Sequence, residues 1–191
     1  MRRLIHCFVI GLLVLAISGC QHRGSRNQHQ EAADRMPDME ELIRANRIMV
    51  EEDDRRIAEV ALQQGWELTR TATGEYYQLL SRNQAVPTGS AEGATVRPGD
   101  EVALAYTLRL LGGETIRRSA DSGLKRFIVE GSEAESGMHA VVKHFRTGDS
   151  VRIILPPHRA FGLMGDGDKI PGRAILWYEV RVDSIRPAVK I

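Results

Sequence analysis

Residues 154–180 read ILPPHRAFGLMGDGDKIPGRAILWYEV, and this stretch decides the fold. It begins inside an apolar run, Val151–Leu155, which Pro156 and Pro157 end because proline has no N–H to give to a sheet. Glycine and proline are frequent over 156–173, so this segment predicts a long surface loop. Apolar and polar residues then alternate over Ala174–Ile185, which predicts a closing β-strand. The stretch therefore predicts two strands joined by a long loop.

The segments on the N-terminal side continue the strand pattern. Glu101–Leu111 alternates between apolar and polar residues, and Gly112-Gly113 behind it is typical of a hairpin turn. A short strand is predicted over 126–130, and residues 66–80 predict a strand or hairpin that enters the sheet. The apolar face of the 101–111 strand comprises Val102, Leu104, Tyr106, Leu108 and Leu110.

One short helix is predicted among these strands, over Ser136–Arg146. Its apolar residues, Met138, Val141, Val142 and Phe145, follow the i, i+3, i+4, i+7 spacing of a single helix face. Strands with one packed helix predict an α+β fold in which an antiparallel sheet wraps around that helix. Residues 66–187 are expected to form this domain.

A longer helix is predicted ahead of the domain, over 38–64. Pro37-Asp38 is a plausible start with acidic residues in the first turn, and Gly65 is a stop signal. The apolar stripe is broken by Asn46 and Asp53, and the segment is highly charged. Two interpretations stay open: a solvated helix that leans on the domain, or a helical stalk that forms a homodimer.

The first residues have the pattern of an export signal. Arg2 and Arg3 precede an almost wholly apolar run, Leu4–Ile17, whose ~14 residues fall short of the ~20 that span a bilayer. Ile17-Ser18-Gly19-Cys20 resembles a lipobox, which implies a lipoprotein signal peptide over 1–19 and acyl chains on Cys20 that anchor the chain to a membrane. The polar segment 20–37 is expected to be a flexible tether. We expect a lipid-anchored protein of the cell envelope, with the outer membrane or periplasmic side favoured.

Charge and composition narrow the possible partners. The chain has 26 Lys and Arg against 25 Asp and Glu, and loss of Arg2 and Arg3 with the signal leaves 24 against 25. A net charge near −1 argues against nucleic acid as a partner, because such proteins present a basic face. His139, His144 and His158 lack the spacing of metal ligands, and no serine lies in a nucleophile motif. We therefore expect no metal and no cofactor.

Several motifs together resemble the FKBP-type peptidyl-prolyl isomerase family. They are Arg97-Pro98-Gly99-Asp100, Gly112-Gly113-Glu114, Ile154-Leu155-Pro156-Pro157 with Ala160-Phe161-Gly162, and Ile170-Pro171-Gly172 with the strand after it. The resemblance extends from Pro98 to Ile185 and implies an FKBP-like fold. The N-terminal half is similar to the gliding-motility-associated FKBP-type lipoproteins of this family.

The resemblance also implies an activity and a pocket. Such domains accelerate cis–trans isomerisation of Xaa-Pro bonds in polypeptide clients, without nucleophile, metal or cofactor. The expected pocket residues are Tyr106, Ile116, Phe127, Met138, Phe161, Ile170 and Tyr178. Ile170 is expected to offer its backbone N–H to the substrate carbonyl, and whether Phe127 or Ile128 faces inward is left open.

One position departs from the family pattern. The family usually has aspartate directly after the hairpin-strand residue that Ile116 represents, and this chain has Arg117 followed by Arg118. A guanidinium donates hydrogen bonds and accepts none, so the substitution reverses the role of the side chain. Three outcomes are open: a weak isomerase, an isomerase whose apolar wall suffices, or a binding module without activity. Asp121 is a possible ion-pair partner for either arginine.

Two main functions follow as hypotheses. The first is a peptidyl-prolyl isomerase that helps exported or envelope proteins to fold. The second is a non-catalytic chaperone or scaffold lipoprotein in an envelope machine. A third is a structural lipoprotein that dimerises through residues 38–64.

Overall fold

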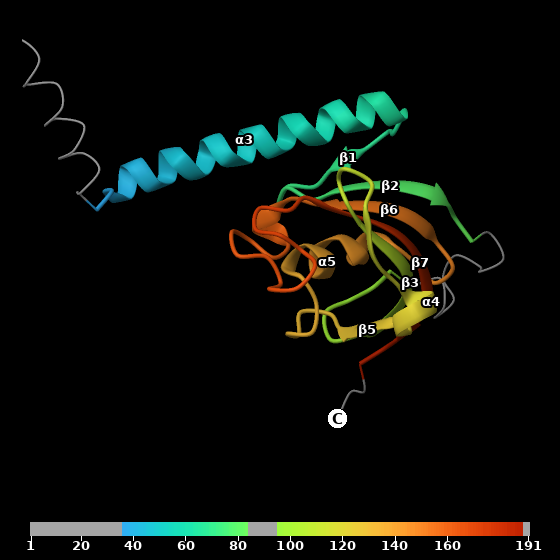
Figure 1. The fold of residues 1–191 in the computed structure, drawn as a ribbon. Helices are drawn as coiled ribbons and strands as arrows, with labels where there is room; N and C mark the ends of the chain where they lie inside the picture. The colour runs from blue at the N-terminus through green and yellow to red at the C-terminus, as the bar shows by residue number, and fades with distance from the viewer. Residues whose placement is uncertain (1–35, 84–94, 189–191) are drawn as a thin grey trace, which may run out of the picture. The chain divides into compact units, whose positions relative to one another are not determined.

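The computed structural model describes residues 36–83 and 95–188 (Figure 1). The predicted signal peptide, the lipidation site Cys20 and nearly all of the predicted tether lie outside these residues. The elements are α3 (Met39–Gln64), β1 (Thr69–Arg70), β2 (Tyr76–Ser81), β3 (Glu101–Leu110), β4 (Thr115–Arg118), α4 (Ser119–Ser122), β5 (Lys125–Ile128), α5 (Ser136–Val141), the 3-10 turn η1 (Val142–His144), β6 (Ser150–Leu155), the 3-10 turn η2 (Pro157–Arg159) and β7 (Leu176–Arg186). The predicted α+β class is confirmed.

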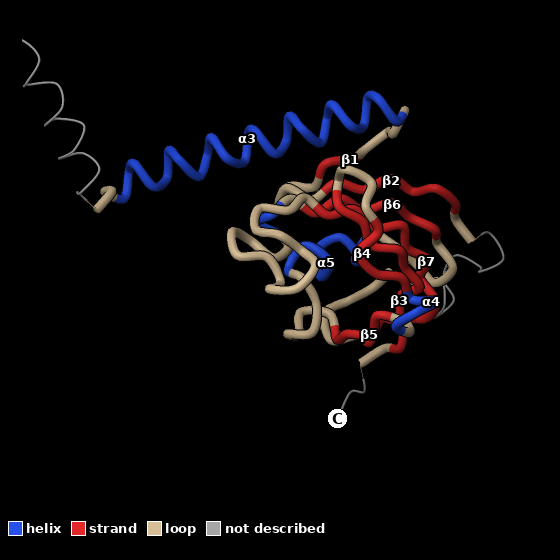
Figure 2. The backbone as a smooth tube through the Cα atoms, viewed as in Figure 1, coloured by secondary structure: helices blue, strands red, loops and turns tan. Residues whose placement is uncertain are grey.

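The strands form one antiparallel sheet in the order β1-β2-β6-β7-β3-β4, and β5 pairs with the first half of β3. The longest pairing joins β3 to β7, from Glu101 opposite Arg186 to Leu110 opposite Leu176. This central pair places the two alternating segments side by side, so each buries the face that its apolar residues define. Figure 2 shows the strands wrapped around α5.

The face of the sheet toward α5 contains the main core. Met138 and Val141 are fully buried, and Val142 and Phe145 are 1% exposed, so the predicted apolar stripe is confirmed. They pack with the predicted face of β3, of which Val102, Leu104 and Leu108 are buried. The helix is shorter than predicted: α5 ends at Val141, a 3-10 turn follows, and Phe145 is extended at φ −115°. The tighter turn keeps Phe145 on the core without a complete helical turn.

The opposite face of the sheet is covered by the second half of α3. Ile57 is fully inaccessible to solvent and packs with Leu111, Ile154 and Ile175. Trp66, just after the helix, contacts Trp177 with ring centroids 4.9 Å apart. Residues 48–191 form one compact unit, separate from 1–47. No helix within 36–83 or 95–188 combines the length and the apolar character needed to cross a bilayer.

Candidate active site

A cavity of about 480 Å³ opens on the α5 side of the sheet, where four strands and two connecting segments converge. Strands β3, β4, β5 and β7 each contribute side chains, and the segments before α5 and after η2 complete the walls. The lining residues are Tyr106, Leu108, Arg117, Lys125, Ser132, Glu133, Ala134, Glu135, Ser136, Ala160, Phe161 and Tyr178. Three of the seven expected pocket residues, Tyr106, Phe161 and Tyr178, therefore meet around one space.

The pairing of β3 with β7 explains why two of the rings meet. Tyr106 lies opposite Val180 and Leu108 opposite Tyr178, so Tyr106 and Tyr178 are diagonal neighbours on one face. Their ring centroids are 6.0 Å apart at 52°, a tilted arrangement that aromatic pairs favour. The Tyr106 hydroxyl lies 3.2 Å from Oγ of Ser122 in α4. The β3–β7 register therefore brings the two rings together, and Ser122 of α4 lies within hydrogen-bond distance of the Tyr106 hydroxyl.

A buried carboxylate supplies the polar part of the cavity. Glu135, directly before α5, is 9% exposed, and its Oε1 accepts a 2.7 Å hydrogen bond from the Tyr178 hydroxyl. Lys125 Nζ lies 3.0 Å from Oε2, as an ion pair without the alignment of a hydrogen bond. Burial, and then the negative charge of Glu135, raises the pKa of the Tyr178 phenol well above 10.0. Tyr178 therefore stays protonated and continues to donate its hydrogen bond to Glu135.

Arg117 lines the same cavity and is exposed. In the described parts of the chain, its guanidinium forms no ion pair or hydrogen bond, and Asp121 pairs with neither Arg117 nor Arg118. The cavity thus contains a carboxylate, although not at position 117: it comes from Glu135 on another segment. At position 117 itself the cavity has an exposed cation in place of a carboxylate.

The other four expected residues are buried beneath the cavity and do not line it. Met138 is fully buried, Phe127 is 2% exposed, Ile170 is 3% exposed and Ile116 is 8% exposed. All four belong to the main core. Ile128 is 48% exposed, so Phe127 is the inward residue of β5. Tyr178 belongs to the same core, and Tyr106 and Phe161 pack against it. A direct contact of the four residues with substrate stays a prediction.

The backbone N–H of Ile170 already has an acceptor. It donates a 2.7 Å hydrogen bond to Oδ1 of Asp166, which also accepts from the N–H of Asp168 at 3.0 Å. These two hydrogen bonds lower the pKa of Asp166. The expected bond from Ile170 to a substrate carbonyl would therefore have to replace the Asp166 bond.

A second buried carboxylate, that of Glu75, does not line the cavity but is connected to its walls through Arg159. Glu75, in the β1–β2 turn, is fully buried and accepts hydrogen bonds from Thr71, from Thr73 and from Nε of Arg159. Nη2 of Arg159 also donates to the carbonyl of Ser136 at 3.4 Å. Burial raises the pKa of Glu75, but the three donors together outweigh burial and lower it below 4.5. Arg159 thus ties the turn to the segments that carry Phe161 and Glu135.

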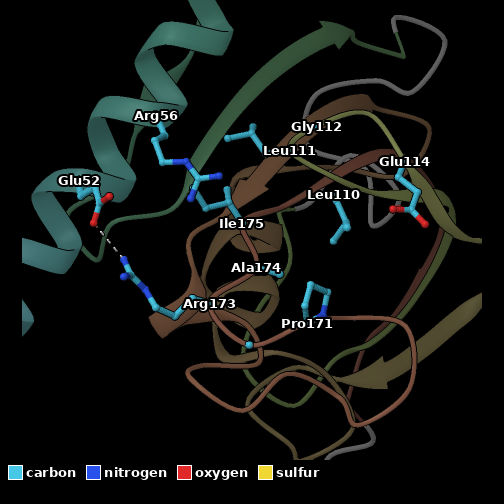
Figure 3. A pocket seen from close by; sticks show the side chains of 11 residues that line it. Glu52, Arg56, Leu110, Leu111, Gly112, Glu114, Pro171, Arg173, Ala174 and Ile175 are labelled. Carbon is cyan, nitrogen blue, oxygen red and sulfur yellow. Dashed lines mark hydrogen bonds and ion pairs between the residues drawn. The ribbon is translucent and has the colours of Figure 1, made fainter.

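Another cavity, of about 470 Å³, lies beside the second half of α3 (Figure 3). It is bounded by Glu52 and Arg56 of the helix, the β3–β4 turn and the segment 171–175. Arg173 bridges its helix side through Glu52 at 3.5 Å and the buried Asp53 at 3.3 Å. Its apolar side chains are aliphatic, and no aromatic ring lines it, in contrast to the cavity around Tyr106, Phe161 and Tyr178.

Sequence patterns did not indicate Lys125, Glu133, Glu135 or Glu75 as site residues. Charged residues next to a turn are ordinarily solvated, and nothing in the spacing of Glu75 or Glu135 signals burial. Glu135 and Glu75 are distinguished by partners from distant segments, Tyr178 for Glu135 and Arg159 for Glu75. Within 36–83 and 95–188, no group of three His, Cys, Asp or Glu side chains is arranged to hold a metal ion.

Comparison with known proteins identifies the family of this chain. The family model for FKBP-type peptidyl-prolyl cis-trans isomerase matches residues 92–183. FK506-binding protein 2 of Dictyostelium discoideum is 31% identical over 90 residues, which are 47% of this chain and 68% of that protein.

Two solved structures share the fold. FkpA from Escherichia coli aligns with a TM-score of 0.57 at 19% identity, over 96% of this chain and 83% of that one. A peptidyl-prolyl cis-trans isomerase from Pseudomonas syringae aligns with a TM-score of 0.59 at 19% identity, over 74% of this chain and 96% of that one. At this identity the two structures show the fold alone. The sequence matches go further: this chain belongs to the FKBP-type peptidyl-prolyl cis-trans isomerase family.

Proposed function

We propose that this chain is a peptidyl-prolyl cis-trans isomerase whose active site is the cavity between Tyr106, Phe161 and Tyr178. The observation that carries the proposal is the convergence of these three rings on one space of about 480 Å³. The rings come from β3, from β7 and from the loop after η2, so local sequence does not explain why they meet. Three rings around one space offer an apolar surface that suits a proline ring, and the polar side chains of the lining are available to the residues on either side of the proline.

The chemistry requires only that the pocket favour a twisted amide. The Xaa-Pro bond has a barrier of ~18–20 kcal/mol because amide resonance keeps it planar. Twisting decouples the nitrogen lone pair and makes the amide less polar, so an apolar wall favours the twisted form relative to water. A ~10⁶-fold acceleration corresponds to about 8 kcal/mol of differential stabilisation. Tyr178, held neutral by burial, provides such a wall without adding charge.

Arg117 places a charge at the edge of the site, and we expect a working enzyme despite it. The guanidinium lies at the exposed rim, whereas the buried charge of Glu135 is already compensated by Lys125 and Tyr178. Water screens an exposed charge, so its effect on the desolvated rings is small. This supports the outcome in which the ring wall still promotes isomerisation.

The location of the enzyme is part of the proposal. The lipobox-like Ile17–Cys20 supports a lipid anchor on Cys20, and the polar segment after it supports a tether that holds the domain outside the cytoplasm. Clients would then be exported or envelope proteins with proline-containing segments. Exposed apolar residues on α3, with Met39 72%, Leu42 49% and Ile43 53% exposed, favour a homodimer through this helix. Sedimentation of the wild-type chain beside Leu42→Lys tests the dimer, and two identical monomeric profiles would reject it.

The test of activity is relaxation of a Xaa-Pro peptide toward its cis–trans equilibrium, with the full chain in mild detergent. We expect acceleration, and a loss of at least tenfold in Phe161→Ala, because that ring forms one wall. The matched control is Leu163→Ala, a nearby residue that is 64% exposed. An uncatalysed rate at micromolar wild-type protein would reject the proposal.

A second function keeps support from the polar residues of the cavity. Arg117, Lys125, Glu133 and Glu135 all line it, and charged linings also suit a peptide-binding module. A non-catalytic chaperone or scaffold would suppress aggregation of an unfolded client without changing the isomerisation rate. Phe161→Ala in both assays separates the two functions, since only an isomerase loses rate.

A further inference from the structure

The rim of the cavity holds a cation that has no partner among the described residues. Arg117 is exposed, lines the cavity, and forms no ion pair or hydrogen bond through its guanidinium with any residue of 36–83 or 95–188. Most other arginines near the sheet are engaged: Arg109 and Arg152 with Glu179, and Arg159 with Glu75. A guanidinium in this setting has five N–H donors available to a ligand.

Two carboxylates near Arg117, those of Glu135 and Asp166, are committed to other partners. Glu135 is held by the Tyr178 hydroxyl at 2.7 Å and by Lys125 at 3.0 Å. Asp166 accepts from the N–H groups of Ile170 and Asp168, and the positive charge of Arg117 acts on it only over a distance. Both acidic groups therefore have their principal partners within the fold, and the guanidinium keeps its capacity for an external carboxylate.

The position of Arg117 relative to the rings determines what it could recognise. It lines the same cavity as Tyr106 and Tyr178, and it pairs across the ladder with Leu108, which lies opposite Tyr178. A proline ring held against these tyrosines would place its neighbouring residues at the rim. Arginine binds a carboxylate through two parallel hydrogen bonds, so the interaction fixes the orientation of the carboxylate and also contributes binding energy.

We infer that Arg117 selects clients with an aspartate or glutamate directly adjacent to the isomerised proline. The inference rests on the proposed isomerase function and specifies its substrate class. Glu133 also lines the cavity and is exposed, so it adds a repulsive element: an acidic neighbour is accepted where it faces Arg117 and disfavoured where it faces Glu133. The preference is thus for an acidic residue on one side of proline and not on both.

The test compares two series of short peptides on the full chain in mild detergent. In one series the residue before proline is Glu, Gln or Lys, and in the other the residue after proline varies in the same way. In the wild type we expect kcat/KM for one Glu peptide to exceed that of its Lys counterpart by about threefold or more, as partly exposed ion pairs provide. The ratio should fall as salt rises from 20 to about 300 mM, because ions screen exposed charges.

Variants assign the preference to one residue. Arg117→Asp should invert the Glu-to-Lys ratio, and Arg117→Gln should bring it close to one. Arg118→Asp is the matched control: it changes the same charge on the same strand, is exposed, and does not line the cavity. Its ratio should stay at the wild-type value. Circular dichroism of all variants verifies folding, and the neutral Arg117→Gln remains informative if the charge reversal is poorly folded.

Failure of the inference differs from failure of the proposed function. If all peptides are isomerised equally, or if Arg118→Asp shifts the ratio as much as Arg117→Asp, the assignment to Arg117 is overturned while the isomerase stands. If no peptide is isomerised, binding of labelled forms of the same peptides, measured by fluorescence anisotropy, tests whether Arg117 recognises a carboxylate. Tighter binding of a Glu peptide that Arg117→Gln abolishes would support the carboxylate site, and equal or absent binding would overturn it.

Discussion

The Tyr178 hydroxyl donates a 2.7 Å hydrogen bond to Oε1 of Glu135, and both side chains are buried in the wall of the cavity. The two residues are 43 positions apart, on the closing strand β7 and on the segment before α5. The bond joins the sheet to the segment that crosses it. An unpaired buried carboxylate would be costly, so the bond also keeps Glu135 in place.

Removing the Tyr178 hydroxyl should lower the stability of the fold while the aromatic ring stays in the cavity wall. We expect Tyr178→Phe to lower the free energy of unfolding by about 1–3 kcal/mol, because Glu135 loses a charge-assisted bond in a buried position. Urea unfolding measures the change. Tyr77→Phe is the control, since that ring packs on Phe145 and its hydroxyl bonds to no residue in the described ranges. Equal losses in the two variants would show that the Glu135 bond contributes nothing specific.

Glu75 should make stability depend on acid pH. Its pKa in the folded chain lies below 4.5, so its contribution is present above pH 4.5 and is lost as pH falls through the folded value. Glu75→Gln should therefore be less stable at pH 7 by about 1–3 kcal/mol and lose less on acidification than the wild type.

Urea unfolding at pH 7 and at pH 3 measures the difference. Glu59→Gln, an exposed position on α3, is the control and should follow the wild type. If the free energy of unfolding of Glu75→Gln falls between pH 7 and pH 3 as much as that of the wild type, the Thr71, Thr73 and Arg159 bonds do not stabilise the ionised form.

Asp166 should protect two amides of the loop after η2. In Asp166→Ala, we expect the N–H groups of Ile170 and Asp168 to exchange with solvent about fivefold faster or more, since each loses a hydrogen bond worth ~1 kcal/mol. Hydrogen exchange by NMR resolves both sites. Adding a proline peptide should restore protection at Ile170 only, if that N–H binds the substrate carbonyl. Equal recovery at both amides, or none, would count against a substrate role for Ile170.

Ile57 should be as costly to truncate as any residue of the sheet. It is fully buried between α3 and the sheet, so Ile57→Ala should lower the free energy of unfolding by about 2–5 kcal/mol. Leu62→Ala, on the same helix and 85% exposed, should change stability by less than about 0.5 kcal/mol. Thermal unfolding measures both, and a mild Ile57 variant would mean that α3 packs on the domain only loosely.

Local pattern predicted most of the fold. The alternation over 101–111 and 174–185 correctly indicated β3 and β7, and the four-residue stripe on α5 correctly indicated its core face. Alternation is informative because one face of a strand is buried and the other is not, whatever its partner is. The end of α5 was less predictable, because a helix and a 3-10 turn bury nearly the same residues.

The candidate site was only partly predictable, for a different reason. Tyr106, Phe161 and Tyr178 were identified through family motifs, and the structure brings them together. Glu135 and Lys125 carry no motif, because an acidic residue before a short helix is equally compatible with full solvation. Glu135 can be buried because Tyr178 and Lys125, on two other strands, pair with its carboxylate.

The order of residue types along the chain indicates which faces are apolar, where the chain turns, and that an arginine stands where the family has aspartate. Which charges are paired and which are open follows from the folded arrangement of the segments. Pairing depends on distances between segments tens of residues apart, as for Glu75 with Arg159 and Glu135 with Tyr178. Hydrophobic periodicity sets the side of the sheet that each residue faces, whereas the partner of a buried charge is set by strand order and register.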